Sequence, residues 1–297
     1  MVAQSLAPAR AVAHLPSRPM RDQVLRAVRR MRLAAVGLAV LILAVAAALL
    51  APLIAPHDPS AVALADRLLS PLSAGHLLGT DGVGQDVLSR VIFGARISLL
   101  VGFSAVAISG ALGVTLGLLS GYFGGWADAA IMRIGEVQLA FPTIILYVAV
   151  MATLGPGLEK LIAVIGVVGW VQYARIERAM TLSLREMEYV QAARALGASS
   201  AWIMLRHILP NTLGPLTVVA SFGLASIMVI EASLSFLGLG VPPSVPSWGS
   251  MLADGRDYLR AGWWVATFPG VALTMCVLAV NLLGDWLRDE LDPLLKY

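Results

Sequence analysis

Charge-free apolar runs are the feature that most constrains how this chain folds. Residues 33–56 contain no charged side chain and directly follow a basic stretch that includes Arg26, Arg29, Arg30 and Arg32. About 20 apolar residues cross a hydrocarbon core of about 30 Å, whereas the apolar part of a signal peptide has only about 7 to 15. We therefore interpret residues 33–56 as an uncleaved first membrane span.

The composition extends this interpretation to the whole chain. Of 297 residues, 58% are hydrophobic and 13% are charged, against about 25% charged in ordinary soluble domains. Further apolar runs follow at residues 97–122, 137–158, 161–174, 209–230 and 261–284. The sequence predicts an all-α integral membrane protein with six transmembrane helices. Pro142 and Pro269 predict bends, because proline removes a helical hydrogen bond.

The distribution of basic residues decides the topology. The run 161–174 is short enough to be a re-entrant segment instead of a span. Counting it as a span, with a cytoplasmic start, places 15 lysines and arginines inside and six outside. Leaving it out moves the arginine-rich residues 175–206 outside, against the positive-inside rule. We therefore predict six spans with both ends cytoplasmic.

This topology divides the chain into segments. We expect a cytoplasmic amino-terminal segment at residues 1–32 and an extracytoplasmic loop at 57–96. A core follows at 97–285, with five spans and a cytoplasmic loop at 175–208, and the tail at 286–297 is cytoplasmic. Residues 238–260 form a second outer loop.

Catalytic patterns are missing from the sequence. Neither lysine, Lys160 or Lys296, follows a glycine, so no phosphate-binding loop is predicted. The histidines at 14, 57, 76 and 207 show no His-Glu-x-x-His pattern, and no Gly-x-Ser-x-Gly elbow occurs. The single cysteine, Cys276, excludes a multi-cysteine metal site. We therefore expect neither an enzyme nor a chain that binds a metal or cofactor itself, and the net charge of +3 is too small to suggest nucleic acid as a partner.

Other polar and aromatic residues allow two interpretations each. Glu231, with Ser235 four residues later, is a candidate for lining a translocation path; the alternative is a helix-terminal glutamate that reaches water at the interface. Asp81 and Asp86 are interpreted as turn residues, since the further acids of a calcium loop are missing. Trp248, Trp263 and Trp264 fit an outer aromatic belt.

The inner segment 186–211 is the most informative stretch. It predicts two short helices separated at Gly197, which tolerates the left-handed conformation that ends a helix. Ser199 or Ser200 can cap the second helix, and Pro210 suits the first turn of the next span. Residues 191–193 offer a small-residue surface that a partner can approach closely. The alternative is an amphipathic helix lying on the membrane.

This segment resembles the membrane-spanning subunits of ABC importers. Their signature is Glu-Ala-Ala, three residues, Gly, nine residues, Ile, one residue and Leu-Pro. The matching residues, with Ala198 beside the glycine, are Gln191, Ala192, Ala193, Gly197, Leu209 and Pro210. Gln191 replaces the acid, and His207 stands in the isoleucine position.

Further stretches are similar to the dipeptide, oligopeptide and nickel family of these permeases, and to its dipeptide permease C subunit. They lie at residues 78–90, 94–102, 121–125, 231–240 and 281–293. Gln85 stands where the family commonly has arginine, and the resemblance covers the chain from about residue 33 onward.

The resemblance implies a permease of the type I ABC importer fold in a bacterial inner membrane. Its implied partners are a homologous second permease, two cytoplasmic ATPase subunits that bind ATP and Mg²⁺, and an extracytoplasmic solute-binding protein. Residues 191–193, Gly197, Ala198, Leu209 and Pro210 would couple to the ATPases. Peptides are the favoured substrates, since no predicted span contains a histidine to serve nickel. Nickel, glutathione and a standalone secondary transporter remain alternatives.

Overall fold

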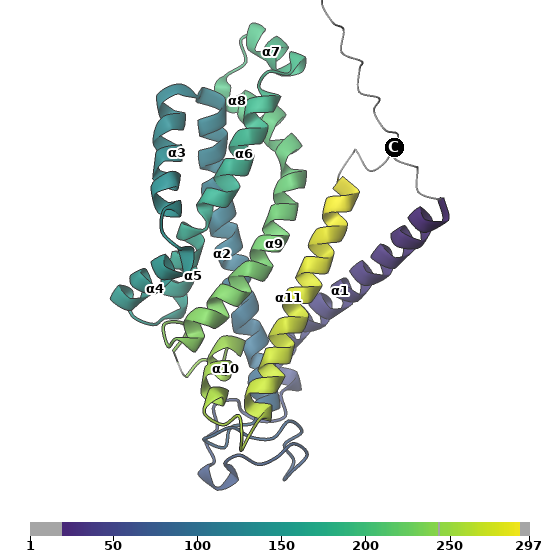
Figure 1. The fold of residues 1–297 in the computed structure, drawn as a ribbon, viewed down its shortest axis with the longest axis vertical. Helices are drawn as coiled ribbons and strands as arrows, with labels where there is room; N and C mark the ends of the chain where they lie inside the picture. Colours follow the sequence, from purple (N-terminus) through teal and green to yellow (C-terminus); the bar gives the residue numbers. More distant parts are fainter. Residues whose placement is uncertain (1–19, 243, 292–297) are drawn as a thin grey trace, which may run out of the picture.

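The computed structural model describes residues 20–242 and 244–291, whose regular elements are all helical (Figure 1). The long helices are α1 (Met20–Ile54), α2 (Val87–Phe123), α9 (Leu209–Phe236) and α11 (Trp264–Leu291). The shorter ones are α3 (Gly125–Leu139), α4 (Thr143–Leu154), α5 (Leu158–Val168), α6 (Trp170–Leu184), α7 (Glu188–Ala195), α8 (Ser200–Ile203) and α10 (Trp248–Arg256). A 3₁₀ turn, Leu64–Asp66, lies in the first loop, and a π-helical turn, Met204–Ile208, joins α8 to α9. The all-α prediction is confirmed.

The described residues contain four helices that are long and apolar enough to cross a membrane. They are Met31–Ile54, Val87–Phe123, Ser200–Phe236 and Trp264–Leu291. Helices α3 and α4 together supply a fifth if they form one span, but they meet at an angle of 87°. The bend predicted at Pro142 is therefore confirmed, and the span at 137–158 stays a prediction. Pro142, which precedes the first residue of α4, lies at this bend.

The predicted span at 161–174 is divided between two helices. Gly169 ends α5 and precedes α6, which ends at Leu184, inside the segment 175–208 that was expected to be a cytoplasmic loop. The six-span count stays a prediction.

Helix α2 is the central element and contacts α1, α3, α5, α6 and α9. The side chain of Asp86 caps it by accepting a hydrogen bond from the Ser89 N–H at 2.8 Å. The helix thus begins at Val87, well before the predicted start of the span at residue 97. Its other end stops at Gly124, whose φ of 64° is left-handed and suits glycine.

Glycines along α2 allow α6 to approach its backbone. A Cβ on Gly113 would lie 2.4 Å from the Trp170 carbonyl oxygen, and one on Gly117 would lie 2.5 Å from that of Ala174. A Cβ on Gly121 would lie 2.7 Å from the Thr181 Cβ. Small residues at this spacing are typical of close helix pairs in membranes, where packing contacts drive association.

Helices α1 and α11 lie side by side at the edge of the fold (Figure 1). Between them, a Cβ on Gly37 would lie 2.8 Å from the Ala279 carbonyl oxygen. Most large apolar side chains of α1 are exposed, including Leu43 at 70% and Leu53 at 82%. An exposed apolar helix face of this length suits contact with lipid.

Two of the three predicted belt tryptophans are buried. Trp248 begins α10 and its indole N–H donates to the Val91 carbonyl at 3.0 Å, while Trp264 donates to the Thr80 carbonyl at 3.0 Å. Both rings are less than a tenth exposed, whereas Trp263 is 52% exposed. The belt interpretation is wrong for Trp248 and Trp264, which attach the outer segments to one another.

The two candidate functional regions lie at opposite ends of the helices. Figure 1 shows α7 and α8 at one end, and the loop between α1 and α2 with α10 at the other. This separation suits a transmembrane protein that contacts different partners on its two sides.

Candidate functional site

The break between α7 and α8 is a helix end of defined geometry. Gly197 has a φ of 82°, in the left-handed region. Its N–H donates to the Arg194 carbonyl at 3.0 Å, and the Ala198 N–H reaches back to the Ala193 carbonyl at 3.1 Å. This pair of bonds is a Schellman motif, which satisfies the last carbonyls of a helix. The predicted break at Gly197 is confirmed.

The chain then re-enters a helix through a capped start. Ser199 accepts a hydrogen bond from the Trp202 N–H at 3.3 Å, which decides between the two predicted caps. The His207 ring packs edge-on against Trp202, with centroids 4.7 Å apart. Leu209 is half-buried and Pro210 lies in the first turn of α9, as the sequence predicts.

One face of this segment packs onto the carboxyl-terminal part of α2. Val190 and Ala193 are buried in a cluster with Leu118 of α2 and with Ile203, Met204 and Ile208. The opposite face is exposed and carries Gln191 and Ala192 together with apolar side chains, among them Leu196 at 88%, whereas Ala198 is half-buried against the cluster. The Gln191 amide donates to the Arg185 carbonyl at 3.2 Å. The segment thus presents a mixed polar and apolar surface that nothing in this chain covers among the described residues.

Charged side chains join the ends of the helices that lie next to α7. Arg178 of α6 pairs with Asp128 of α3, with Nη2 to Oδ2 at 2.6 Å. Arg185 donates to the Gly121 carbonyl near the end of α2 at 2.7 Å, and the Arg194 guanidinium lies 5.6 Å from the Tyr122 ring centroid. A displacement of α7 would therefore reach α2 directly through Arg194, and α6 through the bond from Gln191 to the Arg185 carbonyl. The Arg178–Asp128 pair would pass the displacement from α6 to α3.

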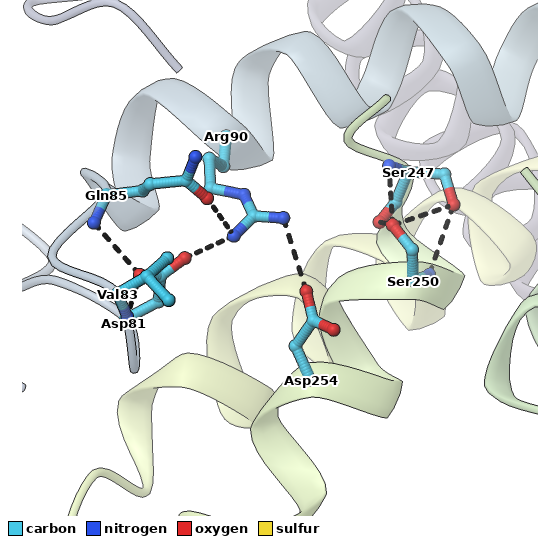
Figure 2. A network of polar contacts seen from close by, with 7 residues as sticks. All are labelled: Asp81, Val83, Gln85, Arg90, Ser247, Ser250 and Asp254. Atoms are coloured by element: carbon cyan, nitrogen blue, oxygen red, sulfur yellow. Dashed lines mark hydrogen bonds and ion pairs between the residues drawn. The ribbon is translucent and has the colours of Figure 1, made fainter. Parts of the chain in front are cut away.

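A second polar network lies at the opposite end of the helices, between the first loop and α10 (Figure 2). The buried guanidinium of Arg90 donates to the Asp81 carboxylate, to Gln85 Oε1 at 2.6 Å and to Asp254 Oδ2 at 3.3 Å. Asp81 Oδ1 also accepts from the N–H groups of Val83 and Gln85, each at 2.9 Å. Burial raises the pKa of Asp254 above its usual value, against the opposing effect of Arg90. Arg90 thus joins the first outer loop to α10.

Glu231 is enclosed by hydroxyl groups. Its carboxylate accepts from Ser235 at 2.9 Å, from Ser247 at 2.9 Å and from Ser98 at 3.2 Å, and Glu231 is 0% exposed. The interpretation that it reaches water at the interface is wrong. Its side chain joins α9 to Ser98 of α2 and to Ser247 at the start of α10, while Ser235 supports the carboxylate from within α9. A role of Glu231 and Ser235 in lining the translocation path stays a prediction.

Glu177 of α6 escaped the sequence analysis. It is fully buried and accepts from the Thr181 hydroxyl at 3.2 Å, while no partner among the described residues reaches its Oε2 atom or the Tyr173 hydroxyl. The sequence predicts a loop at residues 175–208, where a glutamate is ordinarily solvated. The signal available was the four-residue spacing of Tyr173, Glu177 and Thr181, which places them on one helix face.

Three outer residues also come together that the sequence keeps apart. His57, His76 and Asp86 place their ligand atoms within 4.8 Å of one another. Burial opposes ionisation of Asp86, but hydrogen bonds from Ser89 and His76 and the nearby His57 outweigh it, so its pKa lies below the usual value. Asp86, predicted as a turn residue, thus caps α2 and also faces two imidazoles.

Comparison with known families decides the class of this protein. Residues 113–297 match the model of the inner membrane component of binding-protein-dependent transport systems. The chain belongs to this permease family. Residues 20–71 match the amino-terminal transmembrane domain of oligopeptide transport permease C. The resemblance identified from the sequence is therefore confirmed, and the chain is a multi-pass inner-membrane permease of the ABC importer type.

Sequence similarity to curated relatives extends over most of the permease. It is 46% identical to the di/tripeptide permease DppC of Pseudomonas aeruginosa, over 88% of each chain. It is 40% identical to the dipeptide permease DppC of Alkalihalophilus pseudofirmus, over 92% of this chain and 90% of the relative. It is also 42% identical to the glutathione permease GsiD of Pectobacterium atrosepticum, over 94% and 92%.

A solved structure supports the fold. The permease matches a chain of the inward-facing MetNI methionine ABC transporter with a TM-score of 0.53 and 22% identity. The match covers 68% of the permease and 96% of that chain. The shared architecture is that of an ABC importer permease.

Proposed function

We propose that this permease forms half of the pore of an ATP-driven importer of dipeptides and oligopeptides. The observation that carries the proposal is the exposed surface of α7 and α8, which is anchored to α2 on its other face. The chain itself shows no nucleotide-binding motif in its sequence, so the energy for transport would come from partner subunits.

The coupling residues follow from this surface. Gln191, Ala192, Gly197 and Ala198 would contact a cytoplasmic ATPase, and Ala193, Leu209 and Pro210 would hold the segment in place. Closure of an ATPase dimer would displace α7, and the contacts of Val190 with α2 would pass the movement to the helices of the pore. Alternating access results if the helices move as rigid bodies.

The partners and orientation extend the proposal. A homologous permease would complete the pore, two ATPase subunits would bind ATP and Mg²⁺ at the cytoplasmic end, and a solute-binding protein would dock at the end that carries α10 and the first loop. Both termini and the α7–α8 segment would lie in the cytoplasm, which agrees with the excess of arginine predicted for that side.

Peptides are the proposed substrates because several curated relatives are named for dipeptides or tripeptides. Glutathione is a second candidate, because the glutathione permease of Pectobacterium atrosepticum is 42% identical to this chain. Uptake of labelled dipeptide, glutathione and nickel in a strain lacking only this gene tests the assignment. Loss of dipeptide uptake supports dipeptides as the substrate. If dipeptide uptake is intact and glutathione or nickel uptake is lost, the compound whose uptake is lost is the substrate instead.

Docking of the ATPases is tested separately by Leu196→Asp. This side chain is 88% exposed, so a charge there should leave the fold intact and weaken an apolar contact with a partner. We expect ATPase subunits to be lost when the variant is purified through a tag on this chain. The matched control is Leu64→Asp, a 70% exposed leucine at the opposite end, which should retain them. Equal retention in both variants contradicts the docking assignment, and substrate uptake without any ATPase favours a secondary transporter.

A further inference from the structure

Two histidines and an aspartate from three separate segments meet at the outer end of the permease. His57 follows the end of α1, His76 lies in the first loop, and Asp86 caps α2. Their potential ligand atoms all lie within 4.8 Å of one another. Sequence spacing gives no sign of this cluster, because folding of the loop brings the residues together.

The distances are close to those of a metal centre. His76 Nδ1 lies 2.9 Å from Asp86 Oδ1, and His57 Nδ1 lies 3.7 Å from the same oxygen. Ligand atoms about 2.1 Å from a metal ion lie about 3.0 Å apart at a right angle and about 3.4 Å apart at a tetrahedral angle. The two measured distances bracket these values, and all three ligand atoms lie within 4.8 Å of one another. A turn of the exposed His57 ring toward His76 and Asp86 would let the three side chains share one ion.

The carboxylate is held in place by its neighbours. Asp86 Oδ2 accepts from the Ser89 N–H at 2.8 Å and from the Ser89 hydroxyl at 2.7 Å, which leaves Oδ1 directed toward the histidines. The His57 main-chain N–H donates to the Ser89 hydroxyl oxygen at 3.1 Å. Such outer hydrogen bonds orient metal ligands and are part of functional metal sites.

Access to the cluster is open on one side. The Asp86 side chain is 1% exposed and that of His76 is 13% exposed, but that of His57 is 40% exposed. A cavity of about 530 Å³ borders His57 and is also lined by Asp58 and Phe93. An ion can therefore enter from water, and rotation of the exposed His57 ring can complete its coordination.

We propose that His57, His76 and Asp86 bind a divalent transition-metal ion of the zinc class on the extracytoplasmic side. Two imidazoles and one carboxylate suit zinc or nickel, whereas calcium and magnesium prefer sets of oxygen ligands. Three protein ligands leave a position for water. The ion fastens the first loop to the start of α2 and so stiffens the outer surface, independently of which substrate the permease carries.

Zinc binding to the purified full transporter complex, isolated without a histidine tag and stripped with chelator, tests the proposal. Equilibrium dialysis and elemental analysis should find one Zn²⁺ bound per copy of this chain. The affinity for Zn²⁺ should fall by at least about tenfold in His57→Gln and in Asp86→Asn. Asparagine is itself a good helix cap, so Asp86→Asn removes the charge and keeps the start of α2. Comparable size-exclusion profiles verify folding.

The matched control is His207→Gln, which alters a histidine at the opposite end and should keep the zinc. Co²⁺ gives a second readout, because its visible absorption should be present in the parent and in His207→Gln and lost in the two cluster variants. The proposal is overturned if the parent complex binds no Zn²⁺ at this stoichiometry. It is also overturned if both cluster variants bind Zn²⁺ as tightly as the parent.

Discussion

Replacing Arg90 with methionine is expected to destabilise the outer end of the permease. Arg90 is buried and contacts Asp81, Gln85 and Asp254, and Asp81 is itself only 3% exposed. Removing one partner of a buried ion pair costs about 3 to 5 kcal/mol, because the other charge stays buried and unpaired. Methionine preserves much of the side-chain volume, so the loss comes from the polar contacts.

Two features of the structure reduce this cost. Asp81 keeps the hydrogen bonds from the N–H groups of Val83 and Gln85, and the Asp254 side chain is 49% exposed and can turn to water. We therefore expect a loss of about 2 to 4 kcal/mol for Arg90→Met, about 1 kcal/mol less than for a buried pair whose remaining charge is left without other partners. At roughly 2 to 4 °C per kcal/mol, a loss of about 3 kcal/mol lowers Tm by about 6 to 12 °C.

The assay is the temperature at which the tagged complex leaves its size-exclusion peak after heating. Arg256→Met is the matched control, since its ion pair with Asp257 is exposed on both sides and should contribute almost nothing. Arg90→Lys keeps the charge without the planar fork and should fall between the parent and Arg90→Met. The reasoning is refuted if Arg90→Met and Arg256→Met unfold at the same temperature.

Three further predictions concern helix packing, coupling and topology. Gly117→Ala should lower Tm through overpacking of about 1 to 3 kcal/mol, since the new Cβ would lie 2.5 Å from the Ala174 carbonyl oxygen. Gly110→Ala, where the nearest atom would be 3.9 Å away, should not lower it, and an equal loss in both would contradict the close α2–α6 contact. Gly197→Leu should reduce substrate-stimulated ATP hydrolysis while insertion continues, because a side chain at a φ of 82° costs about 1 to 2 kcal/mol. Gly197→Asn, which tolerates this conformation, should retain most of the stimulation, and unchanged stimulation in Gly197→Leu argues against a coupling role. In a Cys276→Ala background, an impermeant thiol reagent should reach Ser244→Cys from outside and Leu196→Cys only from inside, and labelling of both from one side would overturn the topology.

Features that depend on near neighbours in sequence could be predicted from the sequence. The first, second, fifth and sixth apolar runs became α1, α2, α9 and α11, because the length of an apolar run and the thickness of a bilayer decide whether it can span. The break at Gly197, the cap at Ser199 and the position of Pro210 were predictable for the same kind of reason. Each is determined by main-chain conformations and hydrogen bonds within a few residues.

Features that join distant segments were decided by the tertiary structure. Pro142 predicted a bend, but the angle of 87° between α3 and α4 depends on their contacts with other helices. Glu231 meets Ser98 only where α9 crosses α2, and His57 meets His76 only through the fold of the first loop. The helical periodicity of the sequence identifies the helix face on which a residue lies, but it does not identify the residue of another segment that contacts this face. That neighbour is selected by the packing of the helices, since burial of a charged or polar group is tolerated only where the folded chain supplies its partner.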